Sequence, residues 1–172
     1  GYYALAKDNM MKTDEQGSID LIKHSFNLST TTSSNLTSIV SSLKLDKILA
    51  VGYNGYFATS VDGINWDSSG SITTNHLRSV VWSPQIEKFV SVGDDGFYGS
   101  TSDGITWDNS GIISGIARFT SVIWIQELGK FLAVGYTSGG EGYYTTSIDG
   151  ITWGETGNIT DAHTLESVIW AP

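Results

Sequence analysis

Three carboxylates in this sequence could perform acid–base chemistry: Asp94 and Asp95 in Gly93-Asp-Asp-Gly96, and Glu141 in the Gly-rich stretch 135–144. Paired carboxylates cleave glycosides when one protonates the leaving oxygen and the other attacks or activates water. Only their separation in space decides this, so glycoside hydrolysis is kept as an alternative. The two aspartates could also hold calcium in a loop. Solvated charges in an acidic β-turn explain both stretches more simply. We therefore expect no catalytic residue, no resident metal and no cofactor, with a loop calcium ion left open.

Other patterns that carry chemistry are absent from the sequence. His24, His76 and His163 are isolated and lack a metal-ligand spacing such as His-Glu-x-x-His. No Gly-x-Ser-x-Gly nucleophile turn occurs. The chain has no Cys, which excludes disulfides and thiolate zinc sites. These absences favour binding over catalysis.

Variable loops with aromatic and polar residues predict a binding surface. Three corresponding loops, 52–56, 93–97 and 135–144, connect successive strands, and the last carries about four extra residues. Tyrosine rings stack on sugar faces and also anchor protein contacts, although packing between repeat units would explain the same tyrosines. The predicted ligand-binding residues are Tyr53, Asn54, Asp94, Asp95, Tyr136, Glu141 and Tyr143.

These loops must be positioned by a scaffold, and a turn motif that occurs three times indicates which. Residues 60–66, 101–107 and 147–153 each contain Ser or Thr, then Asp-Gly, then Trp. Asp-Gly tolerates the positive φ of a tight turn, and both polar side chains can bond the turn's own backbone. We expect each Trp to fold back over its own turn. The predicted structural residues are Asp62, Gly63, Trp66, Asp103, Gly104, Trp107, Asp149, Gly150 and Trp153.

A second repeated sequence marks the first strand of each unit. It reads Ser-Val-Val/Ile-Trp at 79–82, 121–124 and 167–170, and 36–43 is a fourth copy with Ser41 in place of Trp. Its serines are Ser38, Ser79, Ser121 and Ser167, separated by 41, 42 and 46 residues; joining the two ends of the chain would give 43. At the N-terminus, Tyr3–Ala6 aligns with Val90–Gly93, and Gly17 aligns with Gly104.

Four strands in a period of ~40–45 residues are the signature of a β-propeller. We predict an all-β fold: a monomeric propeller with four blades of four antiparallel strands, closed by pairing 166–171 with 2–7. The single domain divides approximately into units 1–35 plus 166–172, 36–76, 77–118 and 119–165. The alternative is a fragment of a larger ring, or two chains that share one.

The three turns resemble the box of Asp-box β-propellers, a family with sialidase-type and sorting-receptor-type members and repeat modules of phage and bacterial surface proteins. The family box runs Ser-x-Asp-x-Gly-x-Thr-Trp, whereas this chain has no residue between Asp and Gly, so its box is shortened. The resemblance covers 36–172 well and 1–35 weakly, and it implies a structural box. Sialidases need three Arg, which Lys cannot replace. This chain has two, Arg78 and Arg118, which excludes a sialidase.

The composition of the chain disfavours several classes of binding partner. The net charge is −9 without a basic patch, so we expect neither nucleic acid nor anionic lipid. No apolar run reaches ~18 residues, so we expect no membrane insertion. Gly-Tyr-Tyr-Ala at the start is unlike a signal peptide and suggests a mature or excised domain.

We predict a non-catalytic module for glycan recognition at an extracellular or virion surface. The alternative is a protein-interaction or structural module of a larger assembly.

Overall fold

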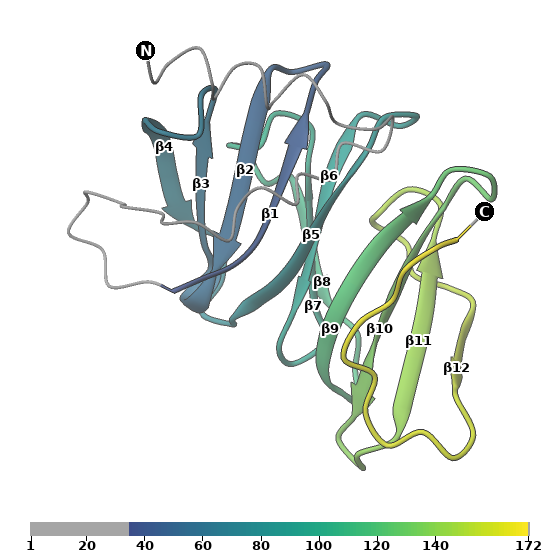
Figure 1. Ribbon diagram of the computed structural model, residues 1–172. Coiled ribbons are helices and arrows are strands. Elements are labelled where there is room, and N and C mark those ends of the chain that lie inside the picture. The colour runs from purple at the N-terminus through teal and green to yellow at the C-terminus, as the bar shows by residue number, and fades with distance from the viewer. Residues whose placement is uncertain (1–34, 172) are drawn as a thin grey trace.

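Residues 35–171, described by a computed structural model, form three four-stranded antiparallel sheets, which confirms the prediction of an all-β fold (Figure 1). The first sheet contains β1 (Leu36–Ser42), β2 (Lys47–Gly52), β3 (Tyr56–Ser60) and β4 (Trp66–Ser71), with the 3-10 turn η1 (Tyr53–Gly55) between β2 and β3. The second contains β5 (Leu77–Ser83), β6 (Lys88–Gly93), β7 (Phe97–Thr101) and β8 (Asn109–Ile112). The third contains β9 (Ile116–Ile125), β10 (Lys130–Thr137), β11 (Gly142–Ser147) and β12 (Thr156–Asn158).

Within each sheet the strands pair in chain order, so every connection is a hairpin. The hairpin between the first two strands turns through a residue with positive φ: Asp46 at 48°, Glu87 at 56° and Gly129 at 58°. The connection between the third and fourth strands is the Asp-Gly turn. Sequence-local pairing of this kind makes each sheet a repeat unit that packs only against its neighbours.

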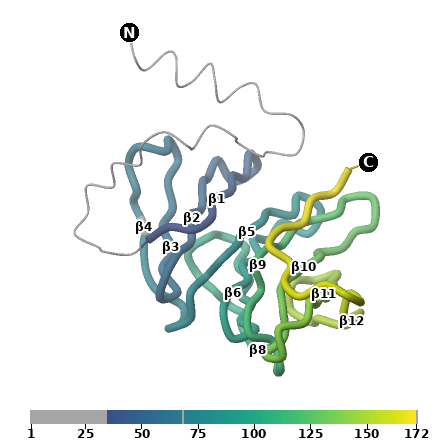
Figure 2. The backbone as a smooth tube through the Cα atoms, turned by 60° about the horizontal axis from the view of Figure 1, so that its bottom comes forward, coloured from purple at the N-terminus to yellow at the C-terminus, as the bar shows by residue number. Residues whose placement is uncertain are grey.

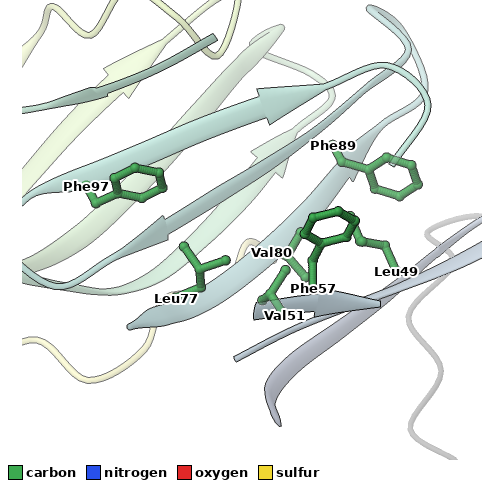
Figure 3. Packing of buried hydrophobic residues seen from close by; sticks show 7 residues of the cluster. All are labelled: Leu49, Val51, Phe57, Leu77, Val80, Phe89 and Phe97. Carbon is green, nitrogen blue, oxygen red and sulfur yellow. The ribbon is translucent and has the colours of Figure 1, made fainter. Parts of the chain in front are cut away.

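The second sheet lies between the other two, and β6 shows this most clearly. Its Phe89 packs toward the first sheet, in the cluster drawn in Figure 3, whereas Val90 and Val92 pack toward the third sheet. Alternate residues of a strand point to opposite faces. A strand covered on both faces is therefore buried along its whole length, as 89–93 is, and its polar Ser91 donates a hydrogen bond to the Ser79 carbonyl.

The first strands of the sheets, β1, β5 and β9, are here called the leading strands, and one contact recurs between them. A serine hydroxyl of each leading strand accepts a hydrogen bond from a backbone N–H of the next. The pairs are Ser38 Oγ with Val80 N–H at 3.1 Å and Ser79 Oγ with Val122 N–H at 3.1 Å. The serines that set the repeat spacing therefore fasten one unit to the next.

The segment 159–171 follows β12 (Figure 2). Its residues 159 and 162 bond Gly142 on β11, and its residues 165–168 lie against β9. It forms no strand, and no sheet closes on itself within residues 35–171. The predicted pairing of 166–171 with 2–7, and the unit assigned to 1–35, fall on residues 1–34, which lie outside the described part of the chain. The structure therefore shows three sheets rather than four blades, and the closed ring stays a prediction.

Candidate binding rim

The loops that follow β2, β6 and β10 lie at the same end of the sheets as the segments that precede the leading strands. Backbone hydrogen bonds of 2.9 Å join Tyr53 N–H to the Asn35 carbonyl and Asp94 N–H to the His76 carbonyl. A third of the same length joins Asp95 N–H to the Ala117 carbonyl of the next sheet. This end is here called the loop rim, and it carries the residues that the sequence predicted for binding.

At the centre of the loop rim, Asp94 binds both arginines of the chain. Arg78 on β5 donates to the two carboxylate oxygens, with Nε at 2.8 Å from Oδ1 and an Nη at 2.7 Å from Oδ2. Arg118 on β9 donates its Nε to Oδ1 at 2.7 Å. The carboxylate is 18% exposed and the Arg118 side chain 37%, so the second guanidinium is the more accessible one.

Aromatic rings flank this Arg–Asp–Arg group on both sides. Tyr53 stacks on His76 with ring centroids 4.2 Å apart, and the Arg78 guanidinium lies 5.2 Å from the centre of the Tyr53 ring. Tyr136 on β10 lies 5.8 Å from the Arg118 guanidinium. The resulting set, here called the rim cluster, consists of Tyr53, His76, Arg78, Asp94, Arg118 and Tyr136.

The Asp94 carboxylate of the rim cluster is held in its ionised form near neutral pH. Burial opposes ionisation of Asp94, but the hydrogen bonds and positive charges of Arg78 and Arg118 outweigh it and lower the pKa of the carboxyl. The hydrogen bond to Asp94 raises the pKa of Arg78 in turn. With one anion between two cations, the cluster keeps a net positive charge on a chain whose total charge is −9.

Two predicted site residues, Asn54 and Asp95, occupy the same turn position in successive sheets. Both have left-handed backbone with φ of 55°, which Asn and Asp tolerate better than most residues. The Asn54 N–H donates to Nδ1 of His76 at 3.0 Å. Both side chains are exposed. Turn geometry explains their residue types, and their positions on the loop rim leave them accessible to a ligand.

Glu141 and Tyr143 lie at the edge of the loop rim and have partners of their own. The exposed Glu141 accepts a hydrogen bond from the Asn158 amide at 2.6 Å. The half-buried Tyr143 packs with Phe119, with ring centroids 6.4 Å apart. Tyr143 therefore follows the packing alternative considered for the tyrosines, whereas Tyr53 and Tyr136 lie against arginines.

The Asp-Gly turns lie at the opposite end, here called the turn rim, because β3, β7 and β11 run away from the loop rim. Each hydroxyl and Asp bonds its own turn as expected; at Asp103, Oδ1 accepts N–H groups of Ile105 and Thr106, each at 2.7 Å. The glycines have positive φ of 72° to 77°: Gly63, Gly104 and Gly150.

The expectation that each Trp folds over its own turn needs correction. Trp107 packs against Phe57 of the preceding sheet, with centroids 5.8 Å apart, and Trp153 against Tyr98 of the preceding sheet at 5.9 Å. The adjacent sheet offers an apolar surface to the ring: Trp107 packs against the buried cluster that contains Phe57. Trp66, in the first turn, is half-buried.

Within 35–171, no three His, Asp or Glu side chains come together as a metal site. Asp94 already binds two guanidinium groups, which disfavours a cation at 93–96. In the same range, no helix is long and apolar enough to cross a bilayer.

In the sequence, Arg78 and Arg118 counted only against a sialidase and His76 only as an isolated histidine, so none of the three was predicted as a site residue. The sequence does contain a signal for the ion pair, at the residue that follows the last Gly of the second strand in each unit. That position holds Tyr53, Asp94 and Tyr136, so the middle unit has an acid where its neighbours have a ring. An acid that replaces a ring in the one unit flanked by two arginines indicates an ion pair.

No family model matches the chain, and no curated protein does at a significant level. Solved structures do match its fold. The crystal structure of a eukaryotic initiation factor aligns with a TM-score of 0.56 and 7% identity over 78% of this chain. YCF48 from Cyanidioschyzon merolae aligns with a TM-score of 0.48 and 18% identity over 73% of it. The chain spans only 35% and 38% of those two proteins. Identities this low establish a shared fold for the first match and no shared activity.

Proposed function

We propose that this chain is a non-catalytic binding module whose ligand is a glycan held on the loop rim. The observation that carries the proposal is the rim cluster, in which two tyrosines and two guanidinium groups are fixed around one carboxylate. Flat aromatic faces bind sugar rings, and guanidinium groups present several hydrogen-bond donors in a fixed plane. Such preorganised groups lose little conformational freedom when a ligand binds.

The net charge of the chain favours a neutral glycan over an anionic one. The net charge of −9 repels polyanions at long range, while the rim cluster offers donors at short range. We therefore propose a neutral sugar as the ligand, bound by stacking on Tyr136 and by donors of Arg118. The same charge distribution disfavours nucleic acid as a partner.

The rim cluster suits binding better than glycoside hydrolysis. A general acid must carry a proton near working pH, whereas two guanidinium groups hold Asp94 ionised. Glycoside turnover abolished by Asp94→Asn or Glu141→Gln would nevertheless overturn the non-catalytic assignment.

We also propose that the three sheets are blades of a four-bladed, monomeric β-propeller. Sheets that pack only on their neighbours, with leading strands side by side, suit a ring. We propose that the blades belong to the Asp-box propeller family, with the shortened box described above. An extracellular or virion surface would suit a glycan-binding ring of this kind.

A protein partner is the second candidate, and the turn rim favours it. Each Asp-Gly turn exposes an apolar residue: Ile64 is 62% exposed, Ile105 44% and Ile148 65%. Exposed apolar residues repeated on one rim are typical of an interaction surface. On this hypothesis the module belongs to a larger assembly.

A glycan array separates the two candidates. We expect saturable binding of a neutral glycan that is lost in Tyr136→Ala and retained in the turn-rim control Ile64→Ser. Tyr136→Phe keeps the ring and should keep most of the affinity. Absence of any glycan binding in a folded protein, or loss of binding in Ile64→Ser alone, would contradict the glycan proposal.

A further inference from the structure

His76, which directly precedes β5, is held by a contact that its ring can make only while it is uncharged. The Asn54 N–H of η1 donates to His76 Nδ1 at 3.0 Å. A histidine ring nitrogen accepts a hydrogen bond only when it carries no proton, and both nitrogens of the charged ring are donors. The contact therefore requires the neutral ring with its proton on Nε2. Protonation of Nδ1 would set two donors against each other.

The surroundings of His76 disfavour a positive charge on its ring. Tyr53 of η1 stacks on it with 13° between the ring planes, and the Arg78 guanidinium of β5 lies 5.2 Å from the centre of the same Tyr53 ring. A charged His76 would therefore bring a second cation to that tyrosine. The Asp94 carboxylate, in the loop after β6, offers little compensation, because it already accepts hydrogen bonds from two guanidinium groups.

The backbone around His76 is bonded directly to Asp94. The His76 carbonyl accepts the Asp94 N–H at 2.9 Å, and the Asn75 side-chain amide donates to the Asp94 carbonyl at 3.3 Å. Asp94 in turn accepts the Arg118 Nε–H at 2.7 Å. A displacement of residues 75–76 is therefore passed to the carboxylate that orients the donors of Arg118.

The fold does not require a histidine at this position. Its counterpart in the third sheet is Arg118, because each of the two precedes the residue that pairs with the last Gly of the second strand. Both side chains also reach the preceding sheet, His76 at Tyr53 and Arg118 at Asp94. Arginine is always protonated in proteins. The rim cluster thus has a permanent cation at one junction and a titratable ring at the other.

We propose that His76 is a pH-sensitive switch of the loop rim: its protonation breaks the contact with Asn54, loosens the contacts of Asp94 and weakens glycan binding. Histidine ordinarily changes its charge between about pH 5 and about pH 8. The neutral ring keeps the rim cluster ordered at the upper end of this range, so affinity is full there and falls as the pH falls. The effect on affinity rests on the proposed glycan function, whereas the change at His76 needs no ligand.

An NMR titration of the full chain tests the switch without a ligand. At about pH 8 the ring nitrogens of His76 should report an unprotonated Nδ1 and a proton on Nε2. As the pH is lowered to about 5, the Asn54 amide and the Arg118 Nε–H signals should move with the same midpoint as the His76 ring. A proton on Nδ1 at about pH 8, or an Asn54 amide that does not follow the ring, would overturn the inference.

Variants connect the titration to binding. A neutral glycan has no titrating group, so any pH dependence of its affinity belongs to the protein. In the unaltered chain, affinity should be weaker at about pH 5 than at about pH 8 by about fivefold or more. His76→Asn keeps an acceptor that does not titrate, and His76→Phe keeps the ring without an acceptor or a charge. Both should bind with an affinity that does not change over this range.

The two other histidines of the chain supply the controls: His24→Asn and His163→Asn should keep the pH dependence of the unaltered chain. Equal affinities at both pH values in the unaltered chain, or a pH dependence that persists in His76→Asn, would overturn the switch and leave glycan binding standing. Absence of glycan binding at both pH values would contradict the proposed function instead. The NMR titration then decides the switch by itself, because a common midpoint supports it and an invariant Asn54 amide overturns it.

Discussion

At the scale of single residues, Asp94 is the residue on which the loop rim depends. Its carboxylate is the only anion in contact with Arg78 and Arg118 among the interactions seen in residues 35–171. Without it, two like charges would face each other across the junction between the second and third sheets. The residue that looked like a catalytic candidate in the sequence is thus an organiser of cationic and aromatic groups.

Asp94→Asn should lower the free energy of unfolding by about 2 kcal/mol, because it leaves two partly buried guanidinium groups without their counter-ion. Asp95→Asn is the matched control: it changes the same functional group at the next, exposed position, and its effect should stay within ~0.5 kcal/mol. Urea unfolding of the three proteins measures both. Equal stability of the two variants would contradict the role assigned to Asp94.

The Asp-Gly turns should make stability depend on acid pH. Burial raises the pKa of Asp103, but hydrogen bonds from the N–H groups of Ile105 and Thr106 outweigh it and lower that pKa to about 2. Hydrogen bonds from the N–H groups of Asn65 and Ile64 likewise lower the pKa of Asp62 to about 2. Because these folded-state values lie below the usual 3.8, the stabilisation is full above about pH 4 and is lost as pH falls toward 2.

Asp103→Asn should therefore be less stable than the unaltered protein near neutral pH and should lose less stability between about pH 4 and about pH 2. Unfolding by urea at several pH values gives both slopes. A parallel pH dependence for the two proteins would show that Asp103 contributes nothing to acid sensitivity.

At the scale of elements, the tryptophans of the turns join one sheet to the next. Trp107→Ala should lower the free energy of unfolding by ~3–5 kcal/mol, since it removes the ring that covers Phe57. Trp107→Phe should cost much less, because the buried Nε1 makes no hydrogen bond among the described residues. Thermal unfolding measures both. Retained stability in Trp107→Ala with lost ligand binding would reverse the structural assignment.

The longer loop between β10 and β11 is a separate element, closed largely on itself. Thr137 N–H donates to the Glu141 carbonyl at 2.8 Å, and Gly140 N–H donates to the Thr137 carbonyl at 2.9 Å. Deleting 137–141 should therefore change stability by less than about 1 kcal/mol. If the loop contributes to the site, affinity for the array glycan should fall. Unchanged stability and unchanged affinity would leave the insertion without a role in binding.

Much of the architecture could be predicted from the sequence, because it is local. Alternating apolar residues and Asp-Gly turns define hairpins within about 25 residues, and the pairing in each sheet follows chain order. Contacts between residues of different sheets could not be predicted in the same way. The ring of Trp107 contacts Phe57, which lies fifty positions earlier in the chain, so its partner cannot be inferred from the turn itself.

In the candidate site, too, local features could be predicted from the sequence and contacts between sheets could not. The sequence placed Tyr53, Asp94 and Tyr136 on one rim, because repeats put equivalent positions at one end. It did not predict that Asp94 would bind Arg78 and Arg118, since this contact combines residues from two sheets. A comparison of the equivalent positions Tyr53, Asp94 and Tyr136 indicates that an acid replaces an aromatic ring in the middle unit.

At the scale of the whole molecule, the two rims differ in chemistry. The loop rim carries both arginines and two tyrosines of the rim cluster, while the turn rim carries bonded aspartates and exposed isoleucines. We expect the ligand to bind at the loop rim. A ligand on the turn rim would instead favour the protein-interaction alternative.

Arginine side-chain NMR can locate the bound ligand, because the chain has only two arginines and both Nε–H groups donate to Asp94. Titration with a neutral glycan selected on the array should shift both Nε–H signals saturably, with the larger change at the more exposed Arg118. The amides of Ile64 and Ile105 on the turn rim should stay unchanged. Unmoved arginine signals, with saturable shifts at Ile64 and Ile105, would contradict binding at the loop rim.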